Sequence, residues 1–180
     1  MKKVLRHYTG IILLIISLSQ SLFSEEKKSD KEILDITLGL GIPELCNLGV
    51  KFQSEQLQFG LFFGSFPISD ETIYSIGGMM DVHFAGNSIY SKRKPWFFEL
   101  GFNYMRNETE YEIIKYTYFT PAVGYDINLS KELGIALKGG LSIEMTKEEK
   151  KIKPDNSLFD FDFDFPVLPS IGFYFYYRIF

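Results

Sequence analysis

Large apolar residues recur at every second position through most of the chain after residue 33. The stretch "PWFFELGFNYM" (95–105) shows this best, because Trp96, Phe98, Leu100, Phe102 and Tyr104 fall on one face. Successive side chains of a β-strand point to opposite faces, whereas a helix repeats every three to four residues. No segment after residue 33 shows a sustained helical stripe. The alternation therefore predicts an all-β chain built from two-faced strands.

Eight segments carry this alternation. Their lengths reach or nearly reach the roughly nine to eleven residues with which a tilted strand crosses a bilayer. The strands are expected at residues 34–41, 48–53, 57–64, 74–84, 96–105, 116–127, 133–144 and about 167–180.

The second face of these strands is unlike a solvated surface. It consists largely of Gly, Ser, Thr, Ala and Gln, and the charged residues concentrate between strands, at 91–94, 106–112, 130–132 and 146–155. Small residues suit the interior of an eight-stranded barrel, which is only wide enough for side chains. We therefore expect an eight-stranded antiparallel up-and-down transmembrane β-barrel with its large apolar face toward lipid. The alternative is a soluble exported lipocalin-like barrel or sandwich, in which that face would form the core.

The connections give a second, weaker indication. Those after the second and sixth strands are tight, and those after the third, fifth and seventh are longer. Short periplasmic turns and longer outer loops are typical of membrane barrels. Two connections fit poorly: residues 86–94 are long for a periplasmic turn, and the first outer loop, near residues 43–47, is short.

The N-terminus has the features of a secretory signal peptide. Three basic residues, Lys2, Lys3 and Arg6, precede a short apolar run from Gly10 to Leu18, too short for the roughly 20 residues of a spanning helix. We expect residues 1–21 to be the signal peptide, with cleavage after position 24 as the second choice, residues 22–32 to be a flexible periplasmic segment, and 33–180 to be the barrel. Cleavage would change the net charge from −4 to about −7, which argues against nucleic acid as a partner.

The chain resembles the small eight-stranded outer-membrane barrels of OmpA/OmpX type. The shared features are the signal peptide, the eight alternating strands and an aromatic last strand, "IGFYFYYRIF", ending at Phe180. The resemblance implies the outer membrane of a diderm bacterium as location. It also implies two partners, outer-membrane lipid and the barrel-assembly machinery that recognises the last strand.

One position departs from that family's pattern. The residue two before the end is commonly an aromatic facing lipid, and here it is Arg178. Phe173, Phe175, Tyr177 and Ile179 make the better lipid face, which places Arg178 and Phe180 on the other side.

Five charged or titratable residues of the predicted strands fall on the inward face. They form a candidate polar cluster of the lumen: Lys51, Asp81, His83, Glu99 and Lys138. Charges buried in a narrow barrel pair with one another because an unpaired one is costly, so we expect a polar plug, with Arg178 as a further partner. The alternative is that His83 and the carboxylates bind a metal or act as a general base.

The sequence favours a non-catalytic role. Lipid-modifying barrel enzymes direct a Ser and a His to the lipid face, whereas His83, the one histidine after the signal peptide, is expected inside without a neighbouring serine. There is no phosphate-binding glycine loop, and Cys46 is the single cysteine, so no cofactor is expected. A narrow solute channel is the second hypothesis, but side chains fill a lumen of this size. We prefer a structural or surface-interaction role through the outer loops, with any extracellular ligand unknown.

The stretch "LFDFDFDFPVLP" (158–169) raises the question of a calcium site. A calcium loop would require Gly and Glu where Phe165 and Ile171 stand, so that site is not expected. We expect instead a surface hairpin with phenylalanines at the outer lipid interface and opposite charges paired across it. The candidate surface contacts are Lys150, Lys151, Lys153, Asp160, Asp162 and Asp164.

Overall fold

The computed structural model describes residues 34–68, 71–152 and 166–179. These residues form eight β-strands and no helix long and apolar enough to cross a membrane. The strands are β1 (Leu34–Ile42), β2 (Leu45–Ser54), β3 (Leu57–Ile68), β4 (Glu71–Ala85), β5 (Trp96–Glu108), β6 (Glu112–Asn128), β7 (Leu133–Lys151) and β8 (Val167–Ile179).

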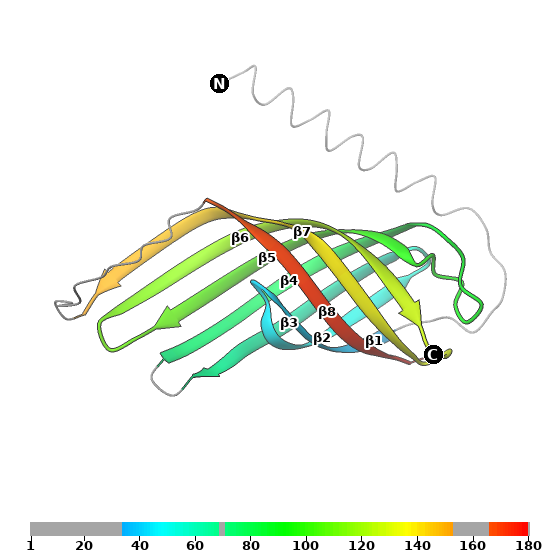
Figure 1. Ribbon diagram of the computed structural model, residues 1–180, viewed down its shortest axis with the longest axis horizontal. Coiled ribbons are helices and arrows are strands. Elements are labelled where there is room, and N and C mark those ends of the chain that lie inside the picture. The colour runs from blue at the N-terminus through cyan, green and yellow to red at the C-terminus, as the bar shows by residue number, and fades with distance from the viewer. Residues whose placement is uncertain (1–33, 69–70, 153–165, 180) are drawn as a thin grey trace, which may run out of the picture. The chain divides into compact units, whose positions relative to one another are not determined.

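The strands close into a barrel in which each pairs with its neighbours in chain order (Figure 1). All pairings are antiparallel, and β1 completes the ring by pairing with β8 from Leu34 opposite Ile179 to Ile42 opposite Ile171. The predicted all-β, eight-stranded, up-and-down barrel is therefore confirmed.

The expectation about connection lengths was partly wrong. The connections after β3 and β5 are short, residues 69–70 and 109–111, because the strands themselves run on. Much of the charged sequence expected between strands is paired: β5 continues to Glu108, β6 begins at Glu112 and β7 continues to Lys151. Backbone hydrogen bonds do not require apolar alternation, so pairing continues where the alternation has ended.

The two ends of the barrel differ. The near end, where β1 begins and β8 finishes, has the connections 55–56, 86–95 and 129–132. The far end has the turn 43–44 and the connection 109–111; β3 and β7 end there, and β4 and β8 begin there. β1 and β2 have 9 and 10 residues, whereas β6 and β7 have 17 and 19, so the wall extends further at the far end on the β6–β7 side (Figure 1).

Large apolar side chains point away from the lumen, as predicted for a membrane barrel. Leu48, Leu61 and Ile171 are 60%, 63% and 63% exposed. On the last strand Ile179 faces outward and Arg178 is buried inside, while Phe180 lies outside the described residues. The arrangement is the reverse of a lipocalin-like barrel, whose apolar side chains would fill the interior.

Glycines on the inward face make room for the few large rings in the lumen. A Cβ on Gly39 of β1 would lie 2.2 Å from Cδ1 of Tyr174 on β8, and one on Gly124 of β6 would lie 2.2 Å from Cζ of Phe97 on β5. The small-residue face is thus complementary in shape to these inward aromatics.

Candidate functional site: the charged lumen

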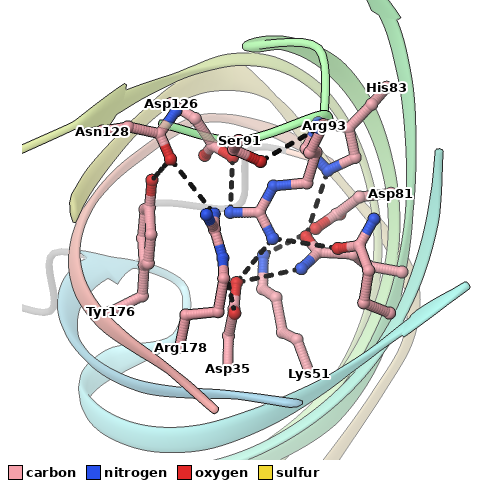
Figure 2. Close-up of polar contacts among 12 residues, drawn as sticks. Asp35, Lys51, Asp81, His83, Ser91, Arg93, Asp126, Asn128, Tyr176 and Arg178 are labelled. Atoms are coloured by element: carbon pink, nitrogen blue, oxygen red, sulfur yellow. Dashed lines mark hydrogen bonds and ion pairs between the residues drawn. The ribbon is translucent and has the colours of Figure 1, made fainter. Parts of the chain in front are cut away.

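The near half of the lumen is filled by an arginine from a connection rather than from a strand. Arg93, in residues 86–95, enters the barrel; its Nη1 lies 2.6 Å from Asp35 Oδ2 and its Nη2 lies 2.8 Å from Asp126 Oδ2 (Figure 2). The Arg93 side chain is 1% exposed. Burial by itself lowers the pKa of Arg93, but Asp126 and Asp35 outweigh it, so the pKa is raised above its ordinary value and the guanidinium stays charged.

Arg178 of β8 shares the Asp35 carboxylate. Its Nε lies 3.5 Å from Asp35 Oδ1, and its Nη2 donates to Asn128 Oδ1 at 3.1 Å. The Tyr176 ring lies 5.1 Å from the Arg93 guanidinium carbon and 5.4 Å from that of Arg178, within cation–π distance. We call Asp35, Arg93, Asp126 and Arg178 the arginine layer.

His83 holds the connection that carries Arg93. Its Nδ1 lies 2.7 Å from the carbonyl oxygen of Lys94, and its Nε2 lies 3.1 Å from Oε1 of Gln58. Gln58 in turn donates from Nε2 to Asp35 Oδ2 at 3.1 Å. The backbone N–H of His83 also donates to the Gln56 carbonyl at 2.8 Å. His83 therefore links the connection 86–95 to the arginine layer.

A second group of charges lies along the lumen. Lys51 donates to Asp81 Oδ2 at 2.6 Å, and Lys138 donates to Glu44 Oε1 at 2.7 Å and to Glu99 Oε1. We call Glu44, Lys51, Asp81, Glu99 and Lys138 the lysine layer. The Tyr174 ring lies 5.9 Å from Lys51 Nζ and 5.2 Å from Lys138 Nζ. All five charged residues are buried.

Beyond these layers, toward the far end, the inward side chains include a set of small polar ones. Ser75 donates to Asn103 Oδ1 at 2.7 Å, and the Thr120 and Ser142 hydroxyls lie 3.4 Å apart. The β1–β2 turn packs here as well, because a Cβ on Gly64 would lie 2.0 Å from the Glu44 carbonyl oxygen.

The structure places all five candidate lumen residues inside the barrel. Lys51, Asp81, Glu99 and Lys138 meet in the lysine layer, whereas His83 bonds to Gln58 beside the arginine layer. Within the described ranges, no group of three His, Cys, Asp or Glu residues is arranged to hold a metal ion.

Sequence reasoning missed Asp35, Glu44, Arg93 and Asp126 as members of the lumen network. Asp35 and Asp126 are isolated acids on the small-residue face, and that signal could have identified them. Glu44 and Arg93 lie in connections, where alternation does not predict the direction in which a side chain points.

The candidate surface contacts are only partly described. Lys150 and Lys151 belong to β7, where they pair in register with Ile113 and Glu112 of β6. The nearby Lys115 Nζ lies 3.4 Å from Glu148 Oε2 across the same two strands. Lys153, Asp160, Asp162 and Asp164 lie outside the described residues, as does the predicted charge pairing across that hairpin.

Fold and interior together define a class: a closed eight-stranded antiparallel barrel, apolar outside and filled by paired charges inside. No protein-family profile matches the chain, and no curated protein matches it either. Among solved structures, the crystal structure of CarO from Acinetobacter baumannii is similar, with a TM-score of 0.49 and 9% sequence identity, over 85% of this chain and 100% of that one.

Proposed function

We propose that this protein is a small integral outer-membrane β-barrel with a structural or surface-interaction role. The observation that carries the proposal is the belt of exposed apolar side chains, with Leu38 of β1, Leu48 of β2, Phe102 of β5 and Ile171 of β8 each more than half exposed. Such a surface in water would be an aggregation hazard, whereas in a bilayer it is solvated by lipid.

The height of the belt suits a bilayer. On β5 the outward apolar side chains run from Trp96 to Tyr104 and on β8 from Ile171 to Ile179, each a span of nine residues, within the range of a tilted membrane strand. The outward side chains at the edge of the belt are of the kind expected at a membrane interface. At the near end Trp96 packs against Tyr125 with ring centroids 4.9 Å apart, and aromatic rings collect at membrane interfaces.

The far boundary is a change from apolar to charged side chains. The tilted rings of Phe102 and Phe119 pack across β5 and β6 with centroids 5.0 Å apart. Two rows further along the same outward face, Arg106 pairs in register with Lys115. The strands beyond this row would stand above the lipid. We place the surface role there because paired strands form a rigid support for the outer connections.

The filled lumen argues against the channel hypothesis. A solute crossing the barrel would have to displace Arg93, which two carboxylates hold, and separate the lysine–carboxylate pairs beyond it. A charged interior is also unsuited to the apolar ligand of a lipocalin-like carrier.

The proposal includes the two partners implied by the family resemblance. Outer-membrane lipid would contact the belt. The assembly machinery would recognise β8, whose outward side is Phe173, Phe175, Tyr177 and Ile179.

Cell fractionation and gel mobility test the location. We expect the mature protein in the outer-membrane fraction and a faster-migrating band in unheated samples, because a folded barrel resists detergent until heated. A protein that remains monodisperse in buffer without detergent would contradict the proposal.

Conductance tests the role. Purified protein in planar bilayers should give no reproducible current steps. Steps of defined size would support the channel hypothesis in place of a structural or surface role, without contradicting the location.

A further inference from the structure

The buried charges of the lumen are unequal in number. Among the described residues, those buried inside comprise four cations and five carboxylates, namely Lys51, Arg93, Lys138 and Arg178 with Asp35, Glu44, Asp81, Glu99 and Asp126. The two ring nitrogens of His83 face the Lys94 carbonyl oxygen and Gln58 Oε1, and a neutral ring donates to one of these oxygens. Because the ring is buried beside Arg93 of the arginine layer, a second positive charge there would be repelled, and we therefore count His83 as neutral. An uncompensated buried charge is costly, so the excess negative charge needs an explanation.

The excess lies in one place. The arginine layer is balanced, with two arginines and two aspartates in mutual contact. The lysine layer has two lysines and three carboxylates: Lys51 pairs with Asp81, and Lys138 pairs with both Glu99 and Glu44.

Within the lysine layer two carboxyl groups face each other directly. Asp81 of β4 and Glu99 of β5 are register partners on the inward side, each 1% exposed. Their lysines occupy one oxygen each, Oδ2 of Asp81 and Oε1 of Glu99. The remaining oxygens, Asp81 Oδ1 and Glu99 Oε2, are buried and accept no hydrogen bond from the described part of the chain. Register partners on one face of an antiparallel pair have their Cβ atoms about 4.5–5.5 Å apart, so the two carboxyl groups are direct neighbours.

We propose that Asp81 and Glu99 together bind one proton in the folded barrel at neutral pH. Two carboxylates this close do not both remain ionised, and a proton between them turns one carboxyl into a donor to the other. The lysine layer then holds two positive and two negative charges. Both lumen layers are balanced, and the chain from Lys51 to Glu44 is continuous.

Every neighbouring element contributes a group that bears on this site. Lys51 comes from β2, Lys138 from β7, the Tyr174 ring from β8 and Glu44 from the β1–β2 turn. His83 lies two residues from Asp81, and Gln58 of β3 is the register partner of Asp81. Of these, Glu44 and His83 are the other places where the proton could reside, and the experiment below separates them.

The proton has a measurable thermodynamic consequence. Unfolded carboxyl groups ionise near pH 4, so unfolding at neutral pH releases the proton that the folded barrel holds. Because the folded state binds the additional proton, its contribution to stability falls as pH rises. Above about pH 5 the unfolding equilibrium constant therefore gains a factor of about ten per pH unit from this proton. The gain stops at the pH at which the folded barrel releases the proton.

Amide substitution tests the proposal. In Asp81→Asn or Glu99→Gln the amide N–H can donate where the proton stood, and the amide oxygen can still accept from the lysine. Both variants should fold at neutral pH. When unfolding is measured in detergent micelles, their unfolding equilibrium constants should lack the additional tenfold increase per pH unit that the wild type shows. The matched control is Asp35→Asn in the arginine layer, which should be less stable at every pH and keep the wild-type slope.

Infrared spectroscopy gives a readout that does not depend on any variant folding. The wild type at pH 7 should show a protonated-carboxyl C=O band, which is retained in Asp35→Asn and lost in both Asp81→Asn and Glu99→Gln. Absence of the band in the wild type would overturn the proposal, whether the lumen is unprotonated or the proton is on His83. Persistence of the band in both amide variants, with loss in Glu44→Gln, would assign the proton to Glu44 and also overturn it.

Discussion

At the scale of single residues, the interior depends on side chains that neutralise one another at fixed positions. Arg93 is the main example, since it joins Asp35 and Asp126 from opposite parts of the wall. The removal of one member leaves buried charges without a partner, which costs far more than the pair contributes by itself.

Arg93→Ala should therefore lower the free energy of unfolding by about 3–5 kcal/mol, the usual range for breaking a buried pair. Urea unfolding in micelles, followed by the folded band on unheated gels, measures it. Lys92→Ala is the matched control, because Lys92 is adjacent in sequence and exposed, and it should change stability little. Equal stability of the two variants would show that Arg93 does not hold the lumen together.

At the scale of elements, closure of the barrel depends on how β1 and β8 approach each other. Tyr174 of β8 lies over Gly39 of β1, and a Cβ there would lie within 2.2 Å of the ring. Gly139 of β7 offers a comparison, because a Cβ at that position would meet nothing within 4 Å.

Gly39→Ala should destabilise the β1–β8 seam and reduce the yield of folded, heat-modifiable protein, since Tyr174 has to move. Gly139→Ala should fold as well as the wild type, or be more stable by about 0.5–1 kcal/mol because alanine restricts the unfolded chain more than glycine does. Refolding yield into micelles measures both. The same yield from both variants would mean that Tyr174 is not seated against β1.

At the scale of the whole molecule, the outward belt is the property that relates the barrel to its surroundings. Leu61, 63% exposed, lies in the outward row with Phe59 and Phe63, whereas the exposed Thr72 is opposite Glu108 at the far end. The proposed membrane position gives these two exposed residues different environments.

Leu61→Arg should make the folded barrel less stable in bilayers by roughly 2–4 kcal/mol, and Thr72→Arg should do so by at most about 1 kcal/mol. This order follows the depth dependence of charged residues on the lipid face. Equilibrium folding into lipid vesicles measures the difference. In a water-soluble barrel the two variants would be about equally stable, because an exposed arginine costs little in water.

Much of the fold could be predicted from the sequence, because the alternation of apolar residues shows directly on which face of a strand each side chain lies. Leu38, Phe59 and Phe102 lie outward as their positions indicate, and even the inward direction of Arg178 followed from the phase of the last strand. The strand ends could not be predicted in this way. From Arg106 and Glu144 toward the far end, backbone pairing continues while the side chains change to mixed polar character.

The sequence by itself determined the eight two-faced strands, the outward direction of the apolar side chains and the inward direction of Lys51, Asp81, Glu99 and Lys138, because a side chain's face depends only on its position along a strand. Only the tertiary structure decided which charges meet. Arg93 and Glu44 come from connections, and Lys138 reaches Glu44 across 94 positions of the chain. Ion pairing acts over a few ångströms of space, and closure of the barrel is what brings these distant positions together.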